Sequence, residues 1–274
     1  MNSQTEGVQY RQYFGITGAD GREQMNTIVI KTPEEIEMMR QAGGKAAEVL
    51  RVVCDAVKPG ITTKELDDLA LQTMEKLGVT SAFLNYMGYP AQTCISVNET
   101  VIHGIPGDRK IKDGDIVSID VGVWHNGFVG DNAKTVMVNV ADPQVRALVH
   151  NTEAALMAGV AEAKPGGRLG NISHAVEVVA NKSKLSVVRE FVGHGCGRKM
   201  HEEPQIPNYG PSGRGPLLRE GMVICIEPML NLGARRICTL DDGWTVVTAD
   251  GKPSAHFEHM VAITADGPEI LTPR

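Results

Sequence analysis

An internal repeat constrains the possible folds of this chain more than any other feature of its sequence. A predicted helix ends at the Lys-Pro-Gly of residues 58–60 and a second helix follows; the same arrangement recurs around the Lys-Pro-Gly of residues 164–166. The segment 112–120 also aligns with 219–227, roughly 107 positions later, and each combines a basic-acidic-glycine turn with a strand that ends in a carboxylate. Two matched features at nearly one offset indicate duplication rather than chance. We therefore expect two similar halves that share one sheet and one core.

Capping signals define the predicted helices. The Thr-Pro-Glu-Glu of residues 32–35 supplies an N-cap, a first-turn proline and a capping-box glutamate for a helix that ends near Val57. A second capping box at residues 62–65 begins a helix that stops before Gly78. The apolar positions expected to share one face of this second helix are Leu66, Leu69, Leu71 and Met74. The other predicted elements are a short strand at residues 28–30, a helix over residues 145–163 and a helix through Ile172, Ala175 and Val179.

Composition places the chain among ordinary globular proteins and excludes several classes of function. Its 274 residues are 42% hydrophobic and 22% charged, and the net charge is -6, values that exclude a disordered or collagen-like chain. With 27 basic against 33 acidic residues and no long run of either sign, we expect no direct binding of nucleic acid. No window approaches the roughly 18 uninterrupted apolar residues of a membrane span, so we expect no membrane association.

The N-terminus and the cysteines indicate the cellular compartment. Residues 1–26 are polar, show neither a helical nor a strand period and lack the regions of a signal peptide. We therefore expect a flexible extension at 1–26, followed by a single domain over 27–274 that is built from the two repeated halves. The five cysteines form no Cys-x-x-Cys pair, which fits reduced thiols better than disulfides or a zinc ribbon. A cytoplasmic protein is expected.

Two carboxylates fall on strands that are apolar enough to be buried. Asp120 ends the strand of the first half, and Glu227 occupies the matching position of the second. An isolated ionised carboxylate in an apolar interior costs many kcal/mol unless it is paired, protonated or bound to a metal. The one cation in residues 130–134 is Lys134, which is either a partner of the acids or a solvated side chain. A divalent metal ion is the partner that these carboxylates favour.

Further metal-binding side chains come from three other segments. An Asn126-Gly127 turn predicts a hairpin that folds Asp131 back beside Asp120. His194 lies in a run with three glycines, and Glu258 follows an apolar segment. The four carboxylates carry four negative charges that two divalent ions would cancel. Without ions the carboxylates would repel one another and titrate abnormally.

In order and spacing these residues resemble the type I methionine aminopeptidases. The matching pattern consists of Asp120 and Asp131 with ten residues between them, His194 in the run Gly-His-Gly-Cys-Gly-Arg-Lys-Met-His-Glu-Glu-Pro of 193–204, Glu227 in Ile-Glu-Pro-Met, and Glu258 after the Asp-Gly-Trp-Thr of 242–245. The likeness extends from about residue 27 to the C-terminus. It implies an α/β (α+β) fold of the duplicated pita-bread type, in which a curved, mostly antiparallel sheet is backed by two helix pairs.

The resemblance also implies a role for each acidic residue. Asp120 would chelate one metal ion, His194 and Glu227 would bind a second, and Asp131 and Glu258 would bridge both. Such an oxygen-rich set suits cobalt, manganese, ferrous iron or zinc, so the ligands do not identify the metal. A hydroxide held between the two ions would attack the scissile carbonyl. Glu227 would carry the proton to the leaving amine.

Two further histidines and an apolar pocket complete the implied site. His103 would hydrogen-bond near the scissile amide, and His201 would stabilise the oxyanion of the tetrahedral intermediate. The positions that match the methionine pocket are Tyr86, Tyr89, Cys94, Trp244, Met200 and Phe83. Of these, Phe83 and Met200 depart from residues common in bacterial members of the family. The other histidines, expected to be structural or solvated, are His125, His150, His174, His256 and His259.

The implied activity is removal of the initiator methionine from nascent polypeptides whose second residue is small. The substrate's free α-amine would occupy a metal position, which explains why one residue is removed at a time. The resemblance further implies a monomer that acts near the ribosome. Two alternatives stay open: an Xaa-Pro peptidase of the same fold, which usually has a large N-terminal domain, and a catalytically inactive binding protein. Inactive relatives lose ligands, whereas this sequence retains all five ligand positions and both histidines.

Overall fold

The computed structural model describes residues 27–273. The extension predicted for residues 1–26 lies outside these residues. Within the described range, none of the helices combines the length and the apolar character that crossing a bilayer requires.

Two helix pairs occupy the positions that the capping signals predict. The helices are α2 (Pro33–Ala56), α3 (Thr63–Leu77), α4 (Pro143–Glu162) and α5 (Leu169–Lys182). Thr32 and Thr62 each form a complete capping box with the glutamate three residues later. Gly78 ends α3 in the left-handed conformation, which glycine adopts without steric cost. The predicted helix boundaries are therefore confirmed to within a few residues.

Two local predictions are wrong. Residues 28–30 form no strand; the nearby backbone bond runs from the Lys31 N–H to the Gly221 carbonyl. One such bond is not a ladder, and the side chains of Val29 and Ile30 are exposed. In α3, Leu71 is also exposed, because the buried face follows Leu66, Ala70 and Met74, the spacing of a 3.6-residue helix.

Most strands of the structure join one antiparallel sheet. The strands are β1 (Thr80–Ser81), β2 (Cys94–Val97), β3 (Thr100–Ile102), β4 (Ile116–His125), β5 (Phe128–Met137), β6 (Ser186–Val187), β7 (Gly193–Gly195), β8 (Glu202–Ile206), β9 (Val223–Ile226), β10 (Met229–Asn231), β11 (Ile237–Thr239), β12 (Val246–Thr248), β13 (Ser254–His256), β14 (Glu258–Thr264) and β15 (Gly267–Ile270). A 3-10 turn, η1 (Tyr86–Gly88), lies between β1 and β2.

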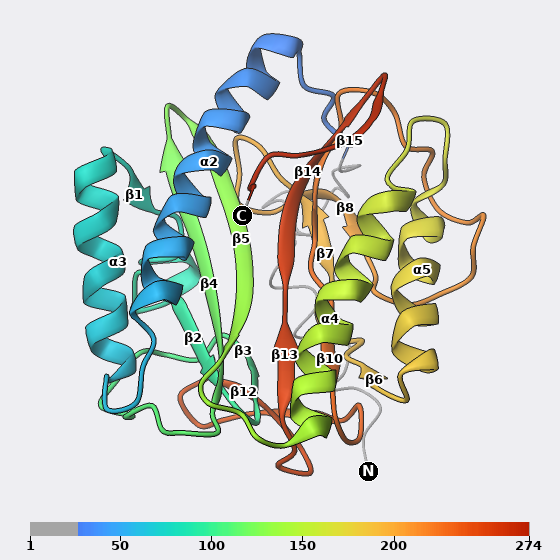
Figure 1. The fold of residues 1–274 in the computed structure, drawn as a ribbon. Helices are drawn as coiled ribbons and strands as arrows, with labels where there is room; N and C mark the ends of the chain where they lie inside the picture. The colour runs from blue at the N-terminus through green and yellow to red at the C-terminus, as the bar shows by residue number, and fades with distance from the viewer. Residues whose placement is uncertain (1–26, 274) are drawn as a thin grey trace.

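The central sheet has nine strands and crosses both halves of the chain. Its order is β1-β4-β5-β14-β9-β7-β8, with β2 paired to β4 and β15 paired to β14. Strand β10 pairs with β13 and β6, and β12 pairs with β11 and β3, in two smaller sheets. Figure 1 shows α2 beside β4 and β5, α3 on the outer side of α2 near β1, and α4 and α5 beside the strands of the second half. The predicted sheet that the two halves share is confirmed.

The predicted hairpin joins β4 and β5. His125 pairs with Phe128, and the residues between them, Asn126 and Gly127, have φ values of 50° and 80°. Positive φ at both central positions is the signature of a type I′ turn, which matches the twist of an antiparallel pair. Asp131 pairs with Gly122, two positions from Asp120, so the two carboxylates are diagonal neighbours on one face.

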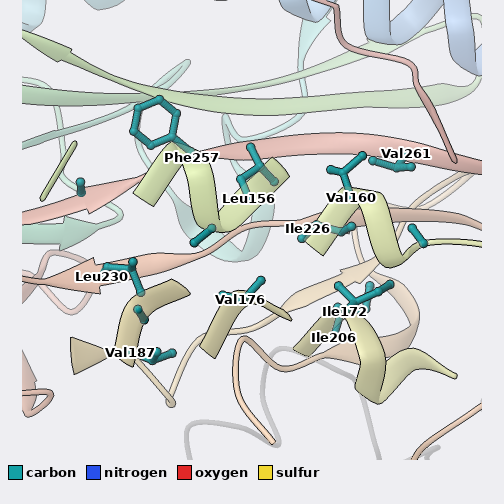
Figure 2. Close-up of a cluster of buried hydrophobic side chains, with 14 of the residues drawn as sticks. Leu156, Val160, Ile172, Val176, Val187, Ile206, Ile226, Leu230, Phe257 and Val261 are labelled. Carbon is teal, nitrogen blue, oxygen red and sulfur yellow. The ribbon is translucent and has the colours of Figure 1, made fainter. Parts of the chain in front are cut away.

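The sheet separates the helices from the acidic residues. On β4, Val117, Ile119 and Val121 pack in a buried cluster with side chains of α2 and α3. On the strands of the second half, Ile226 and Val261 pack with α4 and α5, as Figure 2 shows. Since side chains alternate along a strand, the acids at Asp120, Glu227 and Glu258 project from the opposite face.

The buried apolar side chains form separate clusters rather than the predicted single core. One cluster lies under α2 and α3, another under α4 and α5, and a third between the halves includes Phe128 and Met260. A sheet that passes continuously between two helix pairs gives each pair its own apolar contact surface. The halves therefore share a sheet, while each keeps its own helix-packed core.

Candidate metal centre and adjoining pocket

Five neighbouring strands each bring one metal-binding type of side chain to the same place. In sheet order these are Asp120 on β4, Asp131 on β5, Glu258 on β14, Glu227 directly after β9, and His194 on β7. The register explains why they share a face: Glu258 pairs with the residue opposite Asp120, and His194 pairs with Cys225, two residues before Glu227. All five side chains belong to buried residues.

The distances within this cluster are short. His194 Nε2 lies 3.5 Å from Glu227 Oε1 and 3.6 Å from Asp131 Oδ2. Asp131, His194, Cys225 and Glu258 each offer one ligand atom, and these atoms lie within 4.8 Å of one another. His194 Nδ1 is 2.9 Å from the Gly195 carbonyl oxygen. With Nδ1 donating to that carbonyl, Nε2 is left as the nitrogen that can bind a metal.

The burial of these acids raises their pKa values. Burial is the largest cause of a pKa of about 7 for both Asp120 and Glu227 in the metal-free protein. The pKa values of Asp131 and Glu258 are raised well above the ordinary range, first by burial and then by the neighbouring carboxylates. Within residues 27–273, the buried Oδ1 atoms of Asp120 and Asp131 accept no hydrogen bond. Buried oxygens of this kind are costly unless a cation binds them.

Lys134 does not supply that cation. It pairs with Ile119 across β5 and β4, while the next pair along is Asp120 with Ala133. Because neighbouring residues of a strand face opposite ways, Lys134 projects from the face that carries no acids. The sequence-based option that Lys134 partners the acids is therefore wrong. Among the described residues that line the pocket around the cluster, none is a lysine or an arginine.

An apolar pocket opens beside the acidic cluster. Every residue that the sequence singled out for the methionine pocket lines it: Phe83, Tyr86, Tyr89, Cys94, Met200 and Trp244. The same pocket is lined by the five acidic and imidazole ligand candidates and by His103 and His201, and the structure adds Ile102. The sequence therefore names residues from widely separated parts of the chain that lie together in space.

The aromatic walls of this pocket are held by specific contacts. The Tyr89 hydroxyl donates to the carbonyls of Thr93 and Gly104, at 3.1 and 3.0 Å. Its ring packs edge-on against Trp244, with 5.1 Å between ring centroids. Phe83 lies over β4 at Gly122, where an added Cβ would come within 2.5 Å of the Phe83 ring. Fixed aromatic rings give the pocket a defined shape.

The two predicted catalytic histidines lie at the junction of pocket and cluster. His103 has a φ of 59°, a conformation that non-glycine residues rarely adopt and that clusters at functional sites. His201 Nδ1 is 2.8 Å from the Tyr86 hydroxyl. The centroids of the His201 and His194 rings are 4.4 Å apart. Burial lowers the pKa of His103 to about 4 and that of His201 well below its ordinary value. Both rings are therefore neutral at pH 7.

Two residues near the cluster were not identified from the sequence. Cys225 is not among the site residues that the sequence singles out, but its Sγ lies 4.0 Å from Asp131 Oδ2. His256 was expected to be structural or solvated; it is buried, and its Nε2 is 3.7 Å from Glu227 Oε2. The alternation of side chains along a strand could have identified both residues. Cys225 lies two residues before Glu227 and His256 two residues before Glu258, so each shares a strand face with an acid. In contrast, His150 and His174 are exposed, as predicted.

Comparison with known proteins agrees with this geometry. The family model described as metallopeptidase family M24 matches residues 37–265. The "Methionine aminopeptidase 1" of Bacillus subtilis (strain 168) is 51% identical over 245 residues, which are 89% of this chain and 99% of that protein. The crystal structure of a methionine aminopeptidase from Thermotoga maritima has a TM-score of 0.89 and 46% identity, and the match covers 90% of this chain and 100% of that one.

A more distant neighbour shares the fold alone. Prolidase from Pyrococcus furiosus has a TM-score of 0.72 at 24% identity, and the match covers 90% of this chain but 66% of that chain. The remainder of the prolidase has no counterpart in the match. The resemblance to type I methionine aminopeptidases and the pita-bread fold are both confirmed by these findings. With a family model that spans most of its length, the chain belongs to metallopeptidase family M24.

Proposed function

We propose that this protein is a metal-dependent aminopeptidase that hydrolyses the peptide bond after an N-terminal methionine, when the second residue is small. One observation carries the proposal: the buried row of metal-binding side chains and an apolar pocket form one continuous site. A chain end whose first side chain occupied the pocket would have its first peptide bond beside the acids. The names and close similarity of the bacterial relatives support the same substrate.

The donor set fits two divalent metal ions. Four buried carboxylates and one imidazole converge, and the Oδ1 atoms of Asp120 and Asp131 accept no hydrogen bond in the described part of the chain. In our proposal these five side chains would hold the ions: Asp120 would serve one, His194 and Glu227 the other, and Asp131 and Glu258 would be shared. Cobalt, manganese, ferrous iron and zinc all accept such ligands. Bound ions of this kind lower the pKa of water toward neutrality and polarise a carbonyl.

The chain's own residues supply the proton transfers and the positioning. Glu227 brings a carboxylate to the junction of the acidic row and the pocket, and we assign it the proton transfer to the leaving amine. His103 would donate to the scissile amide, and His201 to the developing oxyanion. The Tyr86 hydroxyl engages His201 Nδ1, so the contact with substrate falls to Nε2.

The apolar pocket accounts for the choice of methionine. Tyr86, Tyr89, Trp244 and Phe83 offer fixed aromatic surfaces, and Met200 offers a thioether that adapts to an unbranched side chain. Cys94 pairs with Asp120 across β2 and β4, so it connects the pocket wall to the acidic row. A β-branched or charged first residue would fit such a pocket less well than methionine.

We extend the proposal to the cellular setting. The substrates are the N-termini of nascent polypeptides, met near the ribosome in the cytoplasm, and the protein acts as a monomer. This part rests on the resemblance to the bacterial enzymes. We also propose that residues 27–274 form a single catalytic domain, since the central sheet runs through both halves.

The test compares peptides that separate the candidate functions. Release of the first residue is measured from Met-Ala-Ser, Leu-Ala-Ser and Leu-Pro-Ser peptides with metal-loaded protein. Methionine release confined to Met-Ala-Ser supports the proposal. Preferential cleavage before proline would favour an Xaa-Pro peptidase, and no release by folded, metal-loaded protein would favour a binding protein.

A further inference from the structure

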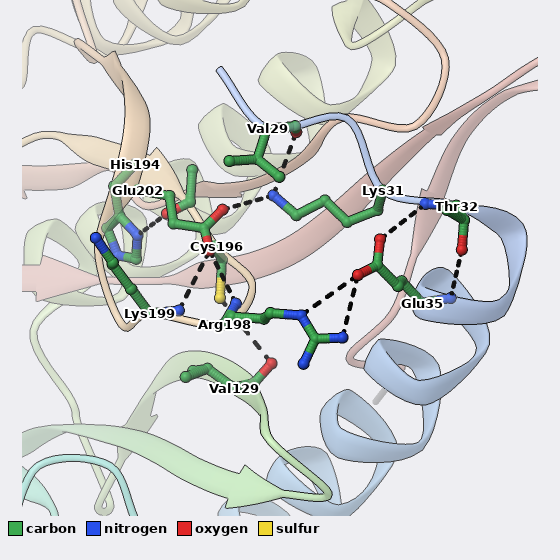
Figure 3. A network of polar contacts seen from close by, with 11 residues as sticks. Val29, Lys31, Thr32, Glu35, Val129, His194, Cys196, Arg198, Lys199 and Glu202 are labelled. Atoms are coloured by element: carbon green, nitrogen blue, oxygen red, sulfur yellow. Dashed lines mark hydrogen bonds and ion pairs between the residues drawn. The ribbon is translucent and has the colours of Figure 1, made fainter. Parts of the chain in front are cut away.

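A glutamate next to His201 closes the loop that carries Met200 and His201. Glu202 Oε1 accepts the backbone N–H groups of Arg198 and Lys199, at 2.8 and 3.2 Å, while Oε2 accepts Lys31 Nζ at 2.7 Å. Figure 3 shows the carboxylate between these donors. Both oxygens are therefore used, one to fold the loop onto itself and one to bind a distant lysine.

The ion pair of Lys31 with Glu202 is buried. The exposed fractions of the two side chains are 3% and 7%. In contrast, Arg198 of the same loop pairs with Glu35 of α2, and the exposed fractions of these two side chains are 62% and 27%. An exposed ion pair contributes little to the free energy of folding. Removal of one partner from a buried pair leaves the other charge buried and uncompensated, which is strongly destabilising. The two pairs form a natural comparison within one loop.

Lys31 connects the loop to the strands that carry two of the acids. Its backbone N–H donates to the Gly221 carbonyl at 2.8 Å, and the Gly221 N–H donates to the Ile263 carbonyl at 3.0 Å. Gly221 lies in the turn that leads into β9, and Ile263 lies on β14. Glu227 and Glu258 are at the other ends of these strands. The lysine is thus fixed to the same framework as the metal centre.

The loop leaves room for this contact only because residue 197 is glycine. A Cβ at Gly197 would approach Glu202 Oε1 to 2.6 Å and Lys31 Cε to 2.8 Å. A glycine-containing loop is intrinsically adaptable, so its conformation depends on the contacts that hold it. Met200 and His201 lie between Lys199, which Glu202 binds, and Glu202 itself, the first residue of β8. A shift of this carboxylate would move both of them.

We propose that the ion pair of Lys31 with Glu202 is a positioning device that fixes Met200 in the pocket wall and His201 against Tyr86. The inference rests on the proposed function, because Met200 and His201 matter only if the pocket takes a methionine side chain. Neither Lys31 nor Glu202 lines the pocket, so their effect on the reaction passes through the loop. Lys31 and Glu202 are positioning residues in this account, not catalytic ones.

The test uses Glu202→Gln and Lys31→Met, with Arg198→Gln as the matched control. Two quantities are measured well below the unfolding temperature: hydrogen exchange of the amides of residues 197–201, and kcat and KM for Met-Ala-Ser and Leu-Ala-Ser. We expect both Glu202→Gln and Lys31→Met to exchange these amides at least tenfold faster. We also expect the preference for methionine over leucine in kcat/KM to fall at least tenfold. Arg198→Gln is expected to stay within twofold of the parent.

The results separate this inference from the proposed function. If the parent protein releases no methionine, the proposed function is refuted. The hydrogen-exchange rates still test whether the ion pair of Lys31 with Glu202 holds the loop. A lower Tm with unchanged exchange and unchanged preference would show a purely structural pair and would overturn the proposal. If a variant does not fold, the milder Lys31→Arg and Glu202→Asp replace it. Lys31→Arg keeps the positive charge and a long side chain, so it should retain more of the preference for methionine over leucine than Glu202→Asp, whose shorter side chain cannot reach both partners. Equal behaviour of the two would also overturn it.

Discussion

His201 illustrates how one side chain depends on its neighbours. Its side chain is half-buried and bound to the Tyr86 hydroxyl, and the ring is neutral because desolvation lowers its pKa well below the ordinary value. A neutral imidazole can donate one hydrogen bond to a developing oxyanion. We predict that His201→Ala lowers kcat for Met-Ala-Ser by about 100- to 1000-fold, the usual effect of removing such a donor.

The control for this variant is His174→Ala, at an exposed position of α5. It should leave kcat and Tm within experimental scatter of the parent. A His201→Ala protein that folds and retains more than a third of the parent kcat would contradict the role of His201 in the reaction.

Asp131 tests the metal centre itself. Asp131 Oδ1 is buried without a hydrogen-bond donor in the described part of the chain, and burial raises its pKa. We predict that Asp131→Asn lowers the number of manganese ions bound in equilibrium dialysis, while the Tm of the metal-free protein does not fall. The second result follows because the amide removes a carboxyl that is costly to ionise. Undiminished metal binding would contradict the assignment of Asp131 as a ligand.

At the residue scale, the sequence predicted more of the site than its local signals alone could. The family resemblance grouped Asp120, Asp131, His194, Glu227 and Glu258 as a set, and the structure places them on or directly after five adjacent strands. Cys225 and His256 were missed because a lone cysteine or histidine on an apolar strand resembles core. Their nearness to Asp131 and Glu227 depends on strand pairing, which one strand's sequence does not specify.

At the element scale, helix α2 lies so close to β5 that glycine is required between them. A Cβ on Gly130 would come within 2.3 Å of the Ala42 carbonyl oxygen, which is backbone and cannot rotate away. We predict that Gly130→Ala lowers the free energy of unfolding by about 1–3 kcal/mol, as overpacking does. Because Gly130 precedes Asp131, metal affinity should fall as well.

Gly44→Ala is the matched control, since nothing lies within 4 Å of a Cβ at this position of α2. Alanine is the better helix former by roughly 0.5–1 kcal/mol, so this variant should be slightly more stable in urea denaturation. A Gly130→Ala protein as stable as Gly44→Ala would refute the close contact of α2 with β5.

The ends of an element could be predicted where a local sequence motif determines them. The predictions failed where the element depends on a packing partner elsewhere in the chain. The capping boxes at Thr32 and Thr62 fixed the starts of α2 and α3, since the cap hydrogen bonds are local. The apolar residues 28–30 read as a strand, but no neighbouring strand accepts them in the structure. Leu71 is apolar yet exposed, because the position of the buried stripe depends on where the sheet lies.

At the scale of the whole molecule, the repeat predicted a shared sheet, and the buried acids couple metal binding to folding. Asp120 and Glu227 have pKa values of about 7 in the metal-free folded protein, against about 4 for exposed carboxyls of an unfolded chain. Between pH 4 and 7 the folded state therefore binds more protons than the unfolded state. The contribution of these two groups to the free energy of unfolding of the metal-free protein is therefore fully present below pH 4 and is lost as the pH rises to 7.

Bound metal ions replace those protons. We therefore predict that the rise in Tm on adding manganese grows from pH 5 to pH 7. Differential scanning fluorimetry at each pH, with and without the ion, measures this increment, and titrating groups remote from the metal centre cancel in the difference. An increment that is largest at pH 5 would contradict the coupling.

The central claim is that the acidic row binds metal ions and, with the pocket, removes an N-terminal methionine. The most direct measurement is release of free methionine from Met-Ala-Ser by metal-stripped protein as manganese, ferrous iron, cobalt or zinc is added in known equivalents, with Leu-Ala-Ser as the control peptide. We predict that one or two equivalents of at least one ion restore release, and that the leucine peptide is left intact. No release with any of the four ions, from protein shown to be folded and to bind them, would contradict the claim.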